Sequence, residues 1–185
     1  ASGIKQHLDG DSPHEFVYLD REDAPDVDFV ADISDYDDIR PAFDGVDAVV
    51  HLAANPAVSA PWESVEQDNL IGTRNVLEAA SDAEVERFLF ASSIHAAGMW
   101  EEEGKPEVYE LDDDTNVTVD DDERPDSYYG VSKAYGEDMG RFYIEQREYP
   151  KRFYAARIAS ARAGVYDNPY GDAERGVERG DWERG

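Results

Sequence analysis

The sequence predicts an α/β fold in which a parallel β-sheet is wound by right-handed crossover connections. Short apolar runs of strand length alternate along the chain with longer segments whose apolar residues recur at helical spacing. Crossovers between parallel strands are right-handed almost without exception. With 185 residues, of which 41% are apolar, the chain can bury one hydrophobic core, so we expect one domain.

Five apolar runs are expected to be the strands, and they lie at residues 15–20, 28–32, 47–54, 87–93 and 152–160. Their bodies are apolar, whereas small or polar residues stand at their carboxyl ends: Asp20, Asp32, Ala53, Ala54, Ser93 and Ser160. In a parallel sheet these ends meet at one edge, which is where ligands bind. The sequence therefore predicts a site at that edge.

Helices are expected at residues 34–43, 62–80 and 127–148. Ser34 is the expected cap of the first helix, and Pro41 is expected to shorten it. The second helix has one apolar stripe, made by Leu70, Thr73, Leu77 and Ala80. Residues 1–10 have the pattern of the end of a helix, residues 94–126 that of a long polar loop, and no clear element is expected from residue 161 onward.

The charge of the chain is extreme, with 44 acidic residues against 17 basic ones, a net charge of −27 and a pI near 4.2. Such a charge repels nucleic acid and anionic membranes, so neither is an expected partner. Acidic disorder is the alternative, but 11% aromatic residues and the clear apolar runs argue against it. We therefore predict a salt-adapted protein that unfolds in part at low salt, where its self-repulsion is unscreened.

The chain contains no cysteine, which excludes disulfides, zinc thiolates and thiol nucleophiles. No apolar run approaches the roughly 18 residues of a membrane span, and no signal peptide is visible. The expected location is cytoplasmic.

The segment from Asp126 to Lys133 carries the most informative pair of residues. Tyr129 and Lys133 are four residues apart, so on a helix they lie on one face, one turn apart. A phenol is a poor base at neutral pH, because its unperturbed pKa is about 10, but a neighbouring ammonium group favours the phenolate. Tyr129 is thus a candidate general base and Lys133 the group that tunes it. The alternative is a core contact beside a solvated charge.

Four motifs, whose order along the chain is informative, are Leu52-Ala53-Ala54, Asn69-Leu70-Ile71-Gly72-Thr73, Phe90-Ala91-Ser92-Ser93 and Tyr129-x-x-x-Lys133. Over residues 16–160 the chain thereby resembles the extended short-chain dehydrogenases/reductases, the NAD-dependent epimerase/dehydratase family. More narrowly, Phe90 to His95 and Tyr129 to Lys133 resemble the uronate dehydrogenases and the haloarchaeal glucose-6-phosphate dehydrogenases. Those enzymes oxidise the anomeric carbon of an aldose to a lactone.

The resemblance implies a Rossmann-type doubly wound parallel sheet over residues 1–160, with residues 161–185 beginning a substrate-binding segment or loop. The Gly-rich turn that holds the cofactor's pyrophosphate in this family is absent from the sequence. We therefore expect this turn to precede Ala1, and most of the substrate-binding segment to follow Gly185. Residues 1–185 alone are expected to bind NAD poorly.

The resemblance also implies catalytic roles. Tyr129 would take the proton of the substrate hydroxyl, and Lys133 would stabilise the phenolate and hold the nicotinamide ribose. Ser93 would form a hydrogen bond with the reacting oxygen, and strand alternation should turn only one of Ser92 and Ser93 toward the pocket. Asn69 matches an Asn that supports this group through water, although a purely structural bond to the backbone is an equal alternative.

For the cofactor, the resemblance implies that Asp20 binds the adenosine ribose hydroxyls. Its carboxylate would repel a 2′-phosphate and favour NAD over NADP, whereas Arg21, which follows at once, would have the opposite effect. Asp32 and Ile33 match the residues beside the adenine ring. Ala53 and Ala54 let the backbone approach the cofactor closely.

The expected substrate is a sugar. His95 aligns with a substrate-contacting His of the uronate dehydrogenases, and Ser59 and Ser160 are further candidates at strand-end loops. Ile94 stands where those enzymes have Asn, which removes a polar contact and puts uronate itself in doubt. His51, within an apolar strand, is expected to be structural.

Two other functions fit the same sequence. A sugar-nucleotide epimerase or dehydratase would retain its NAD through the catalytic cycle. A dehydratase usually carries Thr and an Asp-Glu pair where this chain has Ser92-Ser93-Ile94, which disfavours that activity. The third alternative is an NAD-binding module without catalytic activity.

The acidic segment at residues 112–123 has part of a calcium-loop pattern. Oxygen ligands at calcium-loop positions 1, 3, 5, 9 and 12 would be Asp112, Asp114, Asn116, Asp120 and Glu123. The sixth position, where the sharp turn needs Gly, is Val117, so a solvated loop and no metal site are expected. A homodimer is also considered, because Tyr135, Met139 and Phe142 would support one if they face outward and would join the core if they face inward.

Overall fold

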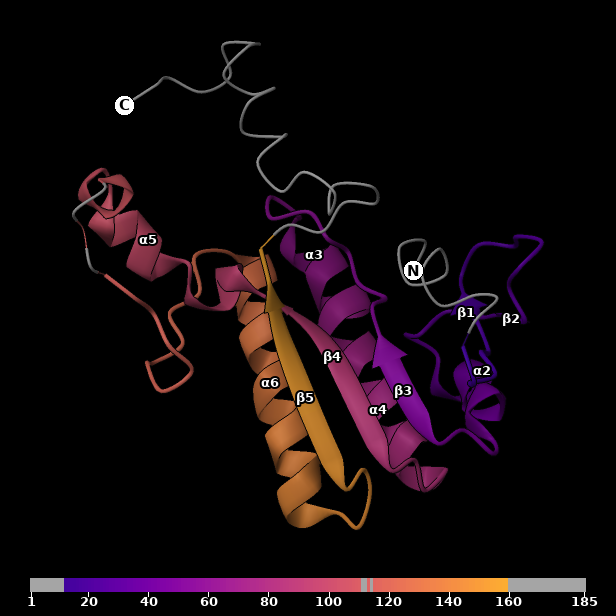
Figure 1. The fold of residues 1–185 in the computed structure, drawn as a ribbon. Coiled ribbons are helices and arrows are strands. Elements are labelled where there is room, and N and C mark those ends of the chain that lie inside the picture. The colour runs from indigo at the N-terminus through magenta and orange to yellow at the C-terminus, as the bar shows by residue number, and fades with distance from the viewer. Residues whose placement is uncertain (1–11, 111–112, 114, 160–185) are drawn as a thin grey trace.

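The computed structural model describes residues 12–110, 113 and 115–159 of the chain. Its strands are parallel and form two sheets (Figure 1). β1 (Leu19–Asp20) pairs with β2 (Phe29–Val30). β3 (Ala48–His51), β4 (Arg87–Ser93) and β5 (Arg152–Ile158) form a sheet of three strands in the order β3-β4-β5. The prediction of an α/β fold with parallel strands is confirmed.

Several strands are shorter than the apolar runs that predict them. β1 and β2 have two residues each. Next to them the Tyr18 N–H donates to the Asp28 carboxylate (2.8 Å), and the Tyr18 carbonyl accepts the N–H groups of Asp28 (2.9 Å) and Phe29 (3.1 Å). β3 ends at His51, so Ala53 and Ala54 lie in the loop that follows it and not in the strand.

The first predicted helix is brief. α2 (Tyr36–Ile39) is capped by Asp35, whose carboxylate accepts the N–H groups of Asp37 and Asp38, so the prediction of Ser34 as the cap is wrong. A 3₁₀ turn follows at Arg40–Phe43, with Pro41 in its first turn. Pro41 therefore ends the α-helix as expected, because proline has no N–H to donate.

The second predicted helix is helical from Trp62 to Asp82 but changes its winding. α3 (Trp62–Ser64) passes into a π-helical stretch (Val65–Ile71), which passes into α4 (Gly72–Asp82). The third, α6 (Tyr128–Gln146), begins where the Ser127 hydroxyl accepts the Gly130 N–H (3.0 Å).

The prediction of a structureless loop over residues 94–126 is wrong in part. It contains 3₁₀ turns at Ile94–Ala97 and Glu107–Tyr109 and the helix α5 (Met99–Gly104). Arg124 holds α5 in place, because its carbonyl accepts the Met99 N–H (2.8 Å) and its guanidinium pairs with Glu103. Contacts between segments, and not an apolar stripe, thus stabilise this short acidic helix.

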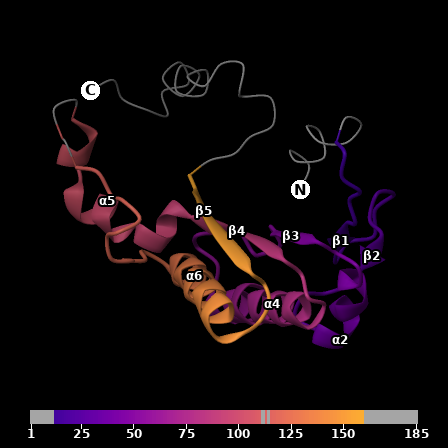
Figure 2. The ribbon, with the colours of Figure 1, turned by 60° about the horizontal axis from the view of Figure 1, so that its bottom comes forward.

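The core lies between the sheet and the helices α4 and α6, which cover the same face of it (Figure 2). Phe88 and Phe90 of β4 point into this core together with Leu77 of α4. α6 approaches the sheet closely because two of its residues are glycines; a β-carbon at Gly136 would overlap the Phe90 ring, and one at Gly140 the Phe153 ring.

The opposite face of the sheet carries a row of apolar residues that are register partners, Val50, Leu89 and Tyr154, and all three are exposed. On α6, Met139 packs against the core, whereas Phe142 is 46% exposed. Met139 thus faces inward and Phe142 outward. No described helix is both long enough and apolar enough to cross a membrane.

Candidate functional site

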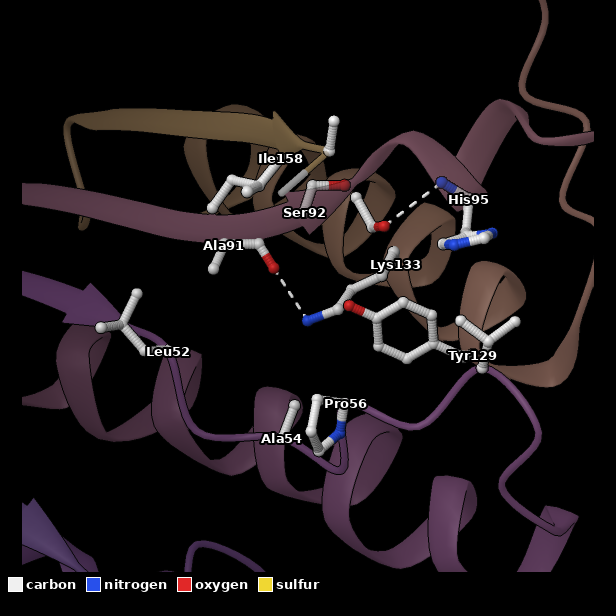
Figure 3. Close-up of a pocket in the computed structure, with 12 residues that line it drawn as sticks. Leu52, Ala54, Pro56, Ala91, Ser92, His95, Tyr129, Lys133 and Ile158 are labelled. Carbon is white, nitrogen blue, oxygen red and sulfur yellow. Dashed lines mark hydrogen bonds between the residues drawn. The ribbon is translucent and has the colours of Figure 1, made fainter. Parts of the chain in front are cut away.

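A pocket of about 270 Å³ opens at the carboxyl ends of β3, β4 and β5 (Figure 3). It is formed by the loop after β3, the last residues of β4 and β5, and the first turns of α6. Its lining comprises Leu52, Ala54, Pro56, Val58, Ala91, Ser92, Ser93, His95, Tyr129, Lys133, Ile158 and Ala159. The pocket lies at the sheet edge where the sequence predicts a site.

Tyr129 and Lys133 stand one turn apart on α6, and both side chains reach the pocket. The Lys133 Nζ lies 5.4 Å from the centre of the Tyr129 ring. Within the described residues the Tyr129 hydroxyl has no hydrogen-bond partner, so it is free to meet a ligand.

Lys133 is buried, with 5% of its surface exposed. Its Nζ donates to the Ala91 carbonyl (2.8 Å) and lies 5.0 Å from the centre of the Phe90 ring. Burial lowers the pKa of Lys133 to about 8, because a charge is less stable away from water. The ammonium form still prevails at neutral pH.

His51 lies in the core below this pocket and fits its predicted structural role. Its Nε2 is 3.1 Å from the Thr73 hydroxyl of α4. Burial, and secondarily the charge of Lys133, lowers the pKa of His51 to about 3. The ring is therefore neutral at all physiological pH values.

Ser92 and Ser93 both line the pocket, but their hydroxyls are engaged differently. The Ser92 hydroxyl donates to Glu137 of α6, which Arg157 of β5 also binds (Nε to Oε1, 2.9 Å). The Ser93 Oγ accepts the His95 N–H (3.2 Å), so its own proton remains available to a ligand. Of the two, Ser93 has the freer hydroxyl.

His95 borders the pocket with its ring edge-on to Tyr129 (5.9 Å between ring centres). Its Nδ1 lies 2.7 Å from Oδ2 of Asp126. Burial alone would raise the pKa of Asp126, but hydrogen bonds from His95 and Ser127 outweigh it and hold the pKa below its usual value. Sequence reasoning assigns no role to Asp126, whose only signal is its place just before the helix cap Ser127.

Asn69 is buried behind the pocket wall and does not line it. Its Oδ1 accepts the Asn55 N–H (2.7 Å), and its Nδ2 donates to the Asn55 carbonyl (3.2 Å) and to the Ser132 hydroxyl (3.0 Å). The structural alternative for Asn69, a bond to the backbone, is thus present. Its support of catalysis through water stays a prediction.

The residues predicted to bind the cofactor are spread along the sheet edge, and of those outside α6 only Ala54 lines this pocket. Asp20 ends β1, where its Oδ1 accepts the Glu22 N–H (3.1 Å). Asp32 accepts the Ser34 N–H (2.8 Å), and hydrogen bonds from Ser34 lower its pKa. Ile33 packs against Gly72, where a β-carbon would overlap it.

Three predicted residues contribute nothing to the described pocket. Ala53 and Ser59 are exposed in the loop after β3 and do not line it. Ser160 lies outside the described residues.

Metal binding finds no support in the part of the chain that the structure describes. Within it, no group of three or more His, Asp or Glu side chains is placed to hold a metal ion. Asp112 and Asp114 of the acidic segment lie outside the described residues.

Comparison with known proteins assigns the chain to a family. Residues 5–178 match the model of the NAD dependent epimerase/dehydratase family. The chain is 43% identical over 121 residues to the NAD-dependent glucose-6-phosphate dehydrogenase of Haloferax volcanii, covering 65% of this chain and 46% of that protein. It is 45% identical over 119 residues to the L-arabinose 1-dehydrogenase (NAD(P)(+)) of the same organism, covering 63% and 46%.

A solved structure is similar as well. The crystal structure of glucuronic acid dehydrogenase from Chromohalobacter salexigens superposes with a TM-score of 0.64 at 30% identity, over 80% of this chain and 52% of that one. The likeness confirms the Rossmann-type α/β fold. The chain spans about half the length of the curated relatives it matches.

Proposed function

Because the chain belongs to the NAD dependent epimerase/dehydratase family, we propose that it carries the catalytic site of an NAD-dependent sugar dehydrogenase. The observation that carries the proposal is the meeting of Tyr129, Lys133 and Ser93 in one pocket at the carboxyl ends of the strands. These three side chains supply a base, a cation that stabilises it and a hydroxyl donor.

The proposed reaction oxidises a C–OH group of the sugar, from which a proton and a hydride must leave. Bound NAD would supply the hydride acceptor. Tyr129, as the phenolate, takes the proton from the substrate hydroxyl. Ser93 donates a hydrogen bond to the same oxygen and holds it in place. Lys133 favours the phenolate, because its ammonium group is buried close to the Tyr129 ring. With an aldose oxidised at its anomeric carbon, the product is a lactone.

The end of β1 fits the adenosine ribose of NAD better than that of NADP. One oxygen of Asp20 accepts the Glu22 N–H, and the other has no partner among the described residues, so it can accept ribose hydroxyls. A 2′-phosphate would meet this carboxylate and be repelled. Arg21, the residue that would favour NADP, has its guanidinium 3.7 Å from Asp68. These contacts support NAD as the cofactor.

The substrate class is proposed from the relatives as well as from the site. These relatives include a glucose-6-phosphate dehydrogenase, an L-arabinose 1-dehydrogenase and a uronate dehydrogenase. The three substrates differ at several groups, but each is a sugar with an oxidisable anomeric centre. An aldose or a simple derivative of one is therefore proposed for this chain.

The test is an assay of the full-length protein in molar KCl, with NAD or NADP and a panel of aldoses, uronic acids and sugar phosphates. Absorbance of the reduced cofactor is the readout. Tyr129→Phe should lower kcat by about 10²- to 10⁴-fold, because it removes the proton acceptor. Tyr128→Phe is the matched control, since Tyr128 is the exposed neighbour on the same helix and should keep parental turnover.

Two outcomes would contradict the proposal. In one, Tyr129→Phe reduces NAD as fast as the parent. In the other, no sugar reduces the cofactor but a nucleotide sugar is epimerised without release of reduced cofactor, which would favour the epimerase alternative.

A further inference from the structure

We propose that Asp126 is a positioning residue that accepts a hydrogen bond from His95 Nδ1–H and so fixes the neutral ring in the Nδ1-protonated tautomer, which leaves Nε2 as a hydrogen-bond acceptor for a neutral hydroxyl group of the sugar. The inference rests on the proposed function for the identity of the ligand. The state of the His95 ring follows from the structure alone and can be measured separately.

The contact between Asp126 and His95 joins two walls of the pocket. His95 belongs to the 3₁₀ turn that follows β4, and Asp126 stands two residues before α6. Their side chains meet at 2.7 Å between Nδ1 and Oδ2, and Asp126 also accepts a hydrogen bond from the Ser127 hydroxyl (2.8 Å). A β-carbon at Gly98 would overlap the Asp126 carboxylate, so the surroundings hold this side chain closely.

The partners of the ring determine which nitrogen carries the proton. An ionised carboxylate can only accept hydrogen bonds, and the pKa of Asp126 lies below its usual value, so Asp126 is ionised at neutral pH. Nδ1 must therefore be the donor. In the neutral ring the other nitrogen, Nε2, is then an acceptor, and among the described residues it has no partner.

The charges around the pocket favour a neutral ligand over an anionic one. Lys133 is the only cation in the described lining, and its Nζ is already bonded to the Ala91 carbonyl. The nearby Arg157 is paired with Glu137 (2.8 Å) and Glu123 (3.3 Å). If His95 were protonated, Asp126 would offset its charge. A sugar carboxylate or phosphate would thus find no free cation in the described wall, whereas a sugar hydroxyl finds an acceptor.

The direct test is NMR of the protein with ¹⁵N-labelled histidine in molar KCl, in alkaline solution where an imidazole is neutral. A His95→Gln variant identifies the ring signals among those of the four histidines. The expected result is a protonated, pyrrole-like Nδ1 and a bare, pyridine-like Nε2. A His95 ring protonated at Nε2 in the parent protein would by itself overturn the proposal.

The variant Asp126→Ala should shift the His95 ring toward the form protonated at Nε2, because the acceptor for Nδ1 is gone. Asp120→Asn is the matched control, since it removes one negative charge from an exposed position of the same segment and should leave the ring unchanged. If Asp126 serves folding alone, Asp126→Ala lowers the melting temperature but keeps the parental tautomer, and that result would contradict the proposal.

Ligand preference is tested with D-galactose and D-galacturonate, which differ only at carbon 6. Galactose should shift the Nε2 signal at the lower concentration and be oxidised with the higher kcat/KM. Asp126→Ala should raise the KM for galactose about tenfold, as expected for one misplaced hydrogen bond between the sugar hydroxyl and Nε2, with a smaller change in kcat. Tighter binding of galacturonate would overturn the substrate assignment. If no sugar of the whole panel is oxidised, the proposed function fails, and the ring signal still decides the role of Asp126.

Discussion

At Lys133, stability and chemistry compete within a single residue. The side chain is buried against Phe90, and among the described residues its one hydrogen-bond acceptor is the Ala91 carbonyl. A buried cation with one hydrogen bond destabilises the fold, as the lowered pKa of Lys133 indicates. Its retention beside Tyr129 agrees with the proposed role, in which the cation is needed for chemistry and not for packing.

Lys133→Met should therefore stabilise the protein at neutral pH while abolishing turnover. The pKa of Lys133 falls from 10.5 to about 8 on folding, so the charged form opposes folding by about 3 kcal/mol below pH 8. Loss of the bond to Ala91 offsets about 1 kcal/mol of that gain. Denaturant unfolding in molar KCl should show the variant more stable by about 1–2 kcal/mol.

The difference should depend on pH with a definite sign. Between about pH 8 and 10.5 the unfolded parent still binds the proton that the folded parent has lost, so the stability of the parent rises with pH. The advantage of Lys133→Met should shrink across this window. A difference that stays constant with pH would contradict the assignment. Lys151→Met, at an exposed lysine, is the control and should show no gain at neutral pH.

Residues of the pocket differ in how far the sequence could predict them. Tyr129 and Lys133 are identified by a spacing of four, and Ser93 by its place at the end of an apolar run. Asp126 is not, because its partner His95 is 31 residues away in the chain and no local pattern marks the pair. The same is true of Ala91, whose contribution is a backbone carbonyl.

At the scale of elements, the helical segment from Trp62 to Asp82 joins the pocket to the first half of the fold. Its π-helical stretch carries Asn69, whose side chain binds both the N–H and the carbonyl of Asn55. Asn75 of α4, six residues further along the same helical segment, binds the carbonyls of Ile33 and Ser34. Two buried asparagines on one segment thus hold two different strand-end loops.

Asn69→Ala should release the loop after β3, which contributes Ala54, Pro56 and Val58 to the pocket. The variant loses three hydrogen bonds and leaves the Asn55 N–H without its acceptor, which should cost about 2–3 kcal/mol of stability. Amide hydrogen exchange is the measurement, and the Asn55 amide should lose its protection.

Asn75→Ala is the matched control for that experiment, because it removes a buried asparagine from the same helical segment. It should destabilise the protein by a similar amount. The free energy of opening at the Asn55 amide, compared with the free energy of global unfolding, should stay unchanged. Equal loss of protection at Asn55 in both variants would mean that Asn69 does not hold the loop locally.

How well each helix or strand could be predicted depends on the strength of its local sequence pattern. The two long helices and the strands β3, β4 and β5 have clear apolar periodicity, and the structure contains all of them near their predicted bounds. The π-helical stretch leaves no mark on a pattern of apolar spacing. α5 is acidic and short, and the contacts that hold it come from Arg124, so its sequence resembles a loop.

At the scale of the whole molecule, charge is the dominant feature. The 44 acidic residues exceed the 17 basic ones by the net charge of −27, so most carboxylates cannot find a cation of the chain. The basic residues that are buried in part, such as Arg157, are already paired. Self-repulsion on this scale opposes the compact state wherever salt does not screen it.

The melting temperature should therefore rise steeply with KCl and then level off. The Debye length falls from about 30 Å at 0.01 M salt to about 3 Å at 1 M, so repulsion between surface carboxylates is removed over that range. Circular dichroism at millimolar KCl should show partial unfolding, and molar KCl should restore the folded spectrum. Sucrose at equal osmolality is the control, because it does not screen charge and should restore far less. A spectrum that is unchanged from molar to millimolar KCl would show that packing against α4 and α6 alone outweighs the repulsion.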